Sequence, residues 1–147
     1  FHDALEALLV RTRDQFGLAI LVDCHSMPSS VRALPGGRRP DIVLGDRYGT
    51  SASSRFVAMA TTHLAEIGFD VARNKPYAGG FITEHYGQPG QGLHAIQVEI
   101  NRGLYADEST FTPHHGFSRL KEQLLRFVER FAADVAAECG ARPAAAE

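Results

Sequence analysis

The stretch that decides the fold is Leu18-Ala19-Ile20-Leu21-Val22-Asp23-Cys24-His25-Ser26. Its apolar part, residues 18–22, has the length and composition of a strand buried on both faces. We therefore predict a buried strand over residues 18–23 that ends in polar groups. In open α/β sheets ligands bind just beyond the carboxyl ends of the strands, and Asp23 and His25 share one face of an extended chain. A strand that runs out into solvent fits this stretch equally well.

Composition limits the classes of protein to consider. A length of 147 residues suits one domain, which we place at residues 1–140, followed by a disordered tail at residues 141–147. With 15 basic and 17 acidic side chains, the charge gives no reason to expect nucleic acid or a membrane as a partner. Two cysteines make no disulfide framework, which favours the cytoplasm. Because the chain opens at Phe1, close to a helical pattern, we expect it to be cut from a longer protein.

Helical and strand patterns alternate along the chain. Strands are predicted over residues 18–23, 41–45, 69–73 and 93–102. Helices are predicted from apolar positions at helical spacing: Leu5, Leu8, Leu9 and Phe16 in the first, Phe56, Ala60, Leu64 and Ile67 in the second, and Leu120, Leu124, Phe127, Phe131 and Val135 in the last. This order predicts a single α/β domain with a mostly parallel or mixed sheet.

Two segments carry candidate functional groups. Residues 74–92 are rich in glycine and include Thr83 and His85, although an ordinary connection explains this segment as well. In the strand over residues 93–102, alternation places Glu99 on the face opposite Ile96, Val98 and Ile100. A glutamate at that position lies on a solvated face or lines a site.

Spacing alone gives only weak support for particular chemistry. A hydrolytic zinc site needs several ligands and a carboxylate base, and His25 with Glu99 supplies one ligand and the base. Cys24 is poorly placed as a nucleophile for His25, because neighbours on a strand point to opposite faces, so we expect Cys24 to be a small buried residue.

Four motifs occur in one order along the chain: Asp23-Cys24-His25-Ser26-Met27-Pro28-Ser29, Pro40-Asp41-Ile42-Val43-Leu44-Gly45-Asp46, Gly79-Gly80-Phe81-Ile82-Thr83-Glu84-His85-Tyr86-Gly87 and Gln97-Val98-Glu99-Ile100-Asn101-Arg102. The segment His2-Asp3-Ala4-Leu5 resembles a helix entry that precedes them. In this order the motifs resemble those of the N-formylglutamate amidohydrolases, relatives of the zinc carboxypeptidases. The resemblance extends over nearly the whole chain.

The resemblance implies a three-layer α-β-α fold of the phosphorylase/hydrolase type with a mixed, mostly parallel sheet. It implies metal-assisted hydrolysis of N-formyl-L-glutamate to L-glutamate and formate, late in histidine breakdown, with Zn²⁺ or another divalent metal as cofactor. His25 then matches a metal ligand and Glu99 the carboxylate that activates water. We assign Arg102, His85 and Thr83 to substrate binding, Arg102 because a bidentate guanidinium suits a carboxylate.

Members of this family are nearly twice as long, so we expect the N-terminal part of the fold, with the other metal ligands, to be absent here. Two alternatives stay open. The substrate is another N-acyl amino acid, or this chain is a truncated binding domain without catalysis.

Overall fold

The computed structural model describes residues 1–30, 34–35, 37 and 39–140. The helices are α1 (His2–Phe16), α2 (Ser54–Glu66), α3 (Phe81–Tyr86) and α4 (Gly116–Gly140). The strands are β1 (Ala19–Met27), β2 (Ile42–Gly45), β3 (Val71–Arg73), β4 (Leu93–Asn101), β5 (Ala106–Asp107) and β6 (Thr112–Pro113). Short 3₁₀ turns are η1 (Arg47–Gly49), η2 (Pro89–Gln91) and η3 (Arg102–Leu104). The predicted tail at residues 141–147 lies outside the described residues.

The main sheet of the described chain has the order β1-β4-β2-β3. Strand β1 is parallel to β4, β2 is parallel to β3, and β2 runs antiparallel to β4. The predicted mixed, mostly parallel sheet is therefore confirmed. Because β2 runs against β4, the residues that follow β2 lie at the opposite end of the sheet from the carboxyl ends of β1 and β4.

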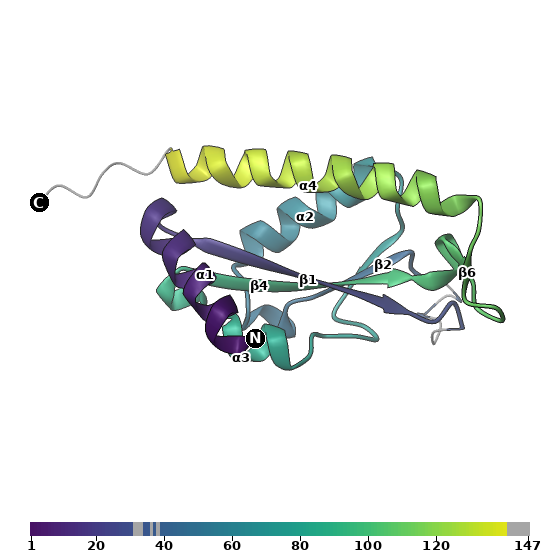
Figure 1. The fold of residues 1–147 in the computed structure, drawn as a ribbon, viewed down its shortest axis with the longest axis horizontal. Helices are drawn as coiled ribbons and strands as arrows, with labels where there is room; N and C mark the ends of the chain where they lie inside the picture. The colour runs from purple at the N-terminus through teal and green to yellow at the C-terminus, as the bar shows by residue number, and fades with distance from the viewer. Residues whose placement is uncertain (31–33, 36, 38, 141–147) are drawn as a thin grey trace, which may run out of the picture.

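Helices cover both faces of this sheet, which confirms the predicted three-layer α-β-α arrangement. Helices α2 and α4 lie over one face, while α1 and α3 lie over the other (Figure 1). Alternation along β4 directs Ile96, Val98 and Ile100 toward α2 and α4, where they pack in the larger core. Each fully buried aliphatic side chain of this kind contributes about 1.5–3 kcal/mol to stability. The other face of β4 is apolar only at its start, where Leu93 packs with residues of α1 and α3.

Strand β1 differs from its prediction in length and in burial. It continues through Asp23 and His25 to Met27, and the side chains of Ile20, Leu21 and Val22 are only half-buried. The reason is that β1 lies at the edge of the sheet in the described part of the chain, with β4 as its neighbour. An apolar run fits an edge strand and a central strand equally well, so the sequence did not separate them.

The segment 74–92 also differs from the predicted glycine-rich connection, because it contains the short helix α3. Helix α1 ends at Gly17, which takes the left-handed conformation, with φ 81°, and whose N–H donates to the carbonyl oxygen of Arg13. None of the helices in the described residues has the combined length and apolar character needed to cross a membrane.

Candidate active site

His25 on β1 and Glu99 on β4 lie directly opposite each other in the parallel pair. Asp23 and Gln97 form the next matched pair, two residues earlier on each strand. Because side chains two apart on a strand share a face, these four side chains lie on the face of the sheet that carries α1 and α3. The sheet therefore brings together the two residues that the sequence singled out for catalysis and metal binding.

Glu99 is buried, with only 7% of its surface exposed. Its Oε1 accepts a hydrogen bond of 2.8 Å from Nε2 of Gln97. Burial raises the pKa of the Glu99 carboxyl above its ordinary value, while the nearby His25 and the Gln97 hydrogen bond offset part of that rise. A carboxyl whose pKa moves toward neutral is better suited to accept a proton and release it again. The prediction that Glu99 is on the face opposite Ile96 is confirmed.

His25 is more open to solvent than Glu99. Its Nε2 lies 2.9 Å from Oδ2 of Asp23, the residue two positions earlier on the same strand. An ionised carboxylate only accepts hydrogen bonds, so Nε2 of His25 is the donor in this contact. A carboxylate that orients an imidazole in this way is typical of histidines that bind metals.

The described residues do not make up a metal site on their own. No group of three or more histidine, cysteine, aspartate or glutamate side chains is arranged to hold a metal within the described ranges. His25 supplies one nitrogen, whereas a catalytic zinc has three protein ligands and a water. The donor set of the described residues is therefore incomplete for zinc.

Thr83 and His85 lie on α3, but they have no hydrogen bond to Glu99 or His25 among the described contacts. Thr83 is fully buried and its hydroxyl donates to the carbonyl oxygen of Gly80 at 2.8 Å. The exposed ring of His85 stacks on Phe81, with 5.1 Å between the ring centroids. Their roles in substrate binding stay predictions.

Arg102 follows directly after β4, at the carboxyl end of that strand. Its Nη1 lies 3.5 Å from Oε1 of Glu108. Its Nη2 lies 3.5 Å from the main-chain oxygen of Ser26 and 3.4 Å from the Ser26 hydroxyl, on the residue next to His25. Arg102 thus bridges the ends of β4 and β1, and its binding of a substrate carboxylate stays a prediction.

The expectation that Cys24 is buried is wrong: its side chain is exposed. Alternation along β1 does place it on the face opposite His25, as predicted. It is exposed on β1, which is an edge strand in the described part of the chain.

Gln97 was not singled out from the sequence, although it is the direct partner of Glu99. Its Oε1 accepts a hydrogen bond of 2.7 Å from the main-chain N–H of Gly80, in the turn before α3. The available signals were its place at the start of the fourth motif and its position two residues before Glu99 on the same face of β4. A glutamine has no chemistry of its own that would have drawn attention to it.

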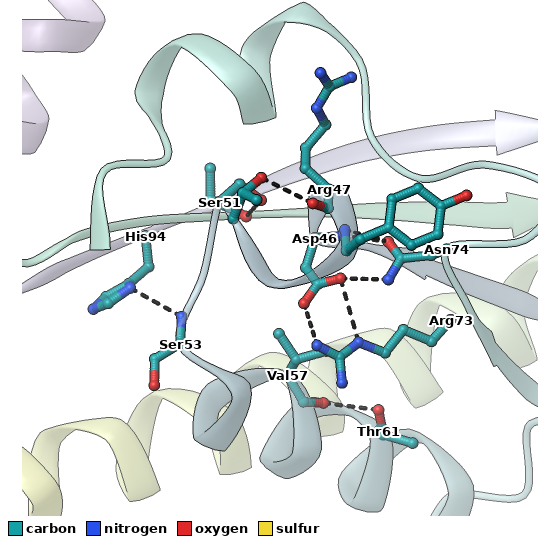
Figure 2. Close-up of polar contacts among 12 residues, drawn as sticks. Asp46, Arg47, Ser51, Ser53, Val57, Thr61, Arg73, Asn74 and His94 are labelled. Atoms are coloured by element: carbon teal, nitrogen blue, oxygen red, sulfur yellow. Dashed lines mark hydrogen bonds and ion pairs between the residues drawn. The ribbon is translucent and has the colours of Figure 1, made fainter. Parts of the chain in front are cut away.

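A second polar cluster, made of Asp46, Arg73 and Asn74, lies near the other end of the sheet, where β2 and β3 end (Figure 2). Asp46 is completely buried and pairs with the guanidinium of Arg73, while Nδ2 of Asn74 donates to Oδ1 of Asp46 at 2.6 Å. Burial alone would raise the pKa of Asp46, but the hydrogen bonds from Arg73 and Asn74 lower it overall. This cluster joins two parallel strands and has no described contact with Glu99, which indicates a structural role.

Comparison with known proteins shows which family this chain resembles. The family model described as N-formylglutamate amidohydrolase matches residues 1–106. The N-formylglutamate deformylase of Pseudomonas aeruginosa is 38% identical over 109 residues, and that of Pseudomonas putida is 36% identical over 110 residues. Each match covers 74% of this chain and 41% of the relative, so the chain spans about two fifths of the length of these curated relatives.

Solved structures agree with this assignment. The N-formylglutamate amidohydrolase of Ralstonia eutropha superposes with a TM-score of 0.80 at 31% sequence identity, over 90% of this chain and 49% of that one. A gene product of Agrobacterium tumefaciens, 20% identical over 90% of this chain and 50% of its own, shares the fold with a TM-score of 0.57. Since the family model covers most of the chain and its motifs contain the His25–Glu99 pair, the chain belongs to the N-formylglutamate amidohydrolase family.

Proposed function

We propose that the whole protein containing this chain is an amidohydrolase that converts N-formyl-L-glutamate to L-glutamate and formate. The observation that carries the proposal is the facing pair His25 and Glu99, within a chain whose relatives at 36–38% identity are N-formylglutamate deformylases. A late step of histidine degradation in the cytoplasm fits this reaction, and a reducing compartment suits the exposed free thiol of Cys24.

Glu99 acts as the general base in this proposal. Its carboxylate takes a proton from the water that attacks the formyl carbon. It then passes that proton to the nitrogen of the leaving amine, so the C–N bond breaks, and formate and the free amino acid are released. The buried position of Glu99 supports this role, because burial moves its pKa toward the pH at which proton transfer in both directions is efficient.

Arg102 binds a carboxylate of the substrate, because a guanidinium fork matches a carboxylate in two parallel hydrogen bonds. In the structure Arg102 is already oriented by Glu108 and lies at the end of β1, where His25 also lies. Thr83 and His85 complete the proposed substrate-binding set. Thr83 does so indirectly, through the Gly80 turn that its hydroxyl holds.

We propose zinc, or another divalent metal, as the cofactor of the whole protein, with His25 as one ligand. At least one further ligand then lies outside the described residues, since these supply no complete set. Metal content is the direct check. The whole protein should retain about one zinc per chain after dialysis against a weak chelator, and His25→Ala should lower that content.

The test of the proposed reaction is formate release by the whole protein from formyl and acetyl derivatives of glutamate, glutamine and aspartate, compared by kcat/KM. N-formyl-L-glutamate should be the preferred substrate. Preference for another member of the set would support the alternative, an amidohydrolase of a different N-acyl amino acid. Binding of N-formyl-L-glutamate in a calorimeter without any turnover would support the second alternative, a domain that binds without catalysis.

A further inference from the structure

Gln97 connects the carboxylate of Glu99 to the turn that leads into α3. Its Nε2 donates to Oε1 of Glu99 at 2.8 Å, and its Oε1 accepts from the main-chain N–H of Gly80 at 2.7 Å. The side chain is nearly buried, with 5% of its surface exposed. Both ends of one amide are therefore used, one by the main chain and the other by the carboxylate.

The partners fix which way round the amide lies. The N–H of Gly80 is only a donor, so the oxygen of the Gln97 amide must face it. The NH₂ group then faces Glu99, whose ionised carboxylate is only an acceptor. Holding Oε1 of Glu99 in this way sets the direction in which its second oxygen, Oε2, points.

The turn that supplies the Gly80 N–H is itself held at several points. The hydroxyl of Thr83 donates to the carbonyl oxygen of Gly80 at 2.8 Å. Arg47 contacts the two preceding residues: its main-chain N–H donates to the oxygen of Ala78 at 2.7 Å and its Nη1 to the oxygen of Gly79 at 3.3 Å. The Gly80 N–H is thus a fixed reference point and not part of a freely moving loop.

We propose that Gln97 is a positioning residue for the general base. Its amide is held by the main-chain N–H of Gly80 and in turn orients the carboxylate of Glu99. The inference rests on the proposed hydrolytic function. Gln97 does not touch the reacting atoms, so its loss reduces kcat through Glu99 and leaves substrate affinity nearly unchanged. General bases depend strongly on geometry, and a displacement of about 1 Å can reduce a rate by on the order of 10²-fold.

Two substitutions in the whole protein separate this role from others. Gln97→Leu and Gln97→Met both remove the donor to Glu99 without adding a charge beside its carboxylate. Both should lower kcat for N-formyl-L-glutamate by about 10- to 100-fold, with KM within about threefold of wild type. Gln91→Met is the matched control, because Gln91 is exposed and bonds only Gln88 among the described contacts, at 2.7 Å. Its kcat should equal that of wild type.

The Glu99→Gln background gives the decisive comparison. If Gln97 acts through Glu99, then adding Gln97→Met to Glu99→Gln causes no further loss of residual kcat, because residues that act as a unit are not additive. A further loss of tenfold or about that size would overturn the inference, as would single variants with wild-type kcat. A wild-type protein that cleaves none of the N-acyl amino acids would overturn the proposed function itself, which is a separate result.

Exchange of the side-chain amide protons with solvent provides a readout without turnover. In the wild-type protein the Gln97 NH₂ protons should exchange much more slowly than those of Gln91, since they are buried and bound to a carboxylate. Glu99→Ala should speed that exchange. Equal exchange at Gln97 and Gln91 in the wild type would show that the bond to Glu99 does not persist in solution, and would overturn the inference.

Discussion

His25 and Glu99 occupy matched positions in the parallel pair β1 and β4, so their side chains extend from the same face of neighbouring strands. Adjacent strands are about 4.8 Å apart, which places an imidazole and a carboxylate within reach of one small molecule. The two groups also influence each other, since the positive form of His25 favours the ionised form of Glu99. The register of β1 against β4 alone brings a ligand-type side chain next to a base, although 73 residues separate the two in the sequence.

Replacing Glu99 by glutamine should remove the base while keeping the shape of the side chain. We expect kcat for N-formyl-L-glutamate to fall by about 10²- to 10⁴-fold, the usual contribution of a general base. The stability of the protein should not fall, because a buried charge is removed and the amide oxygen of the new glutamine can still accept from Gln97. Formate release and thermal unfolding of the same preparation measure the two effects.

The matched control for this variant is Glu129→Gln, an exposed position on α4. It makes the same chemical change without touching the site and should keep wild-type activity. Undiminished formate release in Glu99→Gln would mean that another group takes the proton from water, and the mechanism proposed for Glu99 would then be wrong.

The position of Glu99 in the His25–Glu99 pair could be predicted from the sequence, because the alternation of apolar and polar residues along β4 is clear. Ile96, Val98 and Ile100 mark one face, so Glu99 had to lie on the other. The position of β1 could not be predicted, since an apolar run is compatible with the centre and with the edge of a sheet. Cys24, which we expected to be buried, is exposed on that edge strand.

Other parts of the site depend on contacts between distant segments, which leave no local pattern. The role of Gln97 depends on Gly80, and that contact forms only when the turn before α3 folds over β4. The Asp46–Arg73–Asn74 cluster depends on β2 and β3 pairing in parallel. Helix α3 was missed because its six residues lie between glycines, too few for a helical period to show.

Arg102→Lys should weaken binding of a substrate carboxylate, because lysine cannot reproduce a two-pronged guanidinium contact. We expect KM for N-formyl-L-glutamate to rise by about tenfold or more, as for the loss of a hydrogen bond to a charged group, with a smaller change in kcat. Steady-state kinetics of formate release measure this. Arg126→Lys, on an exposed part of α4, is the control and should match wild type. An unchanged KM in Arg102→Lys would remove Arg102 from the proposed binding set.

Asp46→Asn should destabilise the protein in a way that depends on pH. The pKa of Asp46 in the folded state is below its ordinary value of 3.8, so the ionised form stabilises the fold at all pH values above 3.8. That stabilisation is lost as the pH falls below 3.8 and through the folded-state pKa, where wild-type Asp46 also becomes neutral. We expect a loss of about 2–3 kcal/mol at pH 7 that shrinks toward pH 3, measured by urea unfolding.

The control for Asp46→Asn is Glu66→Gln, which breaks the exposed ion pair between Glu66 and Arg130. Surface pairs of this kind contribute about 0–1 kcal/mol, so this variant should remain close to wild type at both pH values. A loss in Asp46→Asn that is the same at pH 7 and pH 3 would show that the charge of Asp46 is not what stabilises the cluster.

Gly45→Ala tests whether the turn before α3 is really packed against β2. A Cβ at position 45 would lie 2.7 Å from both the carbonyl carbon of Ala78 and the main-chain nitrogen of Gly79. These are main-chain atoms, so they cannot move aside as the end of a flexible side chain would. The turn must shift, and with it the Gly80 N–H that holds Gln97. We expect destabilisation of about 1–3 kcal/mol together with a loss of kcat, because overpacking here displaces the support of Glu99.

Gly90→Ala is the matched control, since a Cβ there meets no heavy atom within 4 Å. Urea unfolding and formate release should both be close to wild type in Gly90→Ala. If Gly45→Ala lost stability but kept full kcat, the turn would support the fold without orienting Glu99.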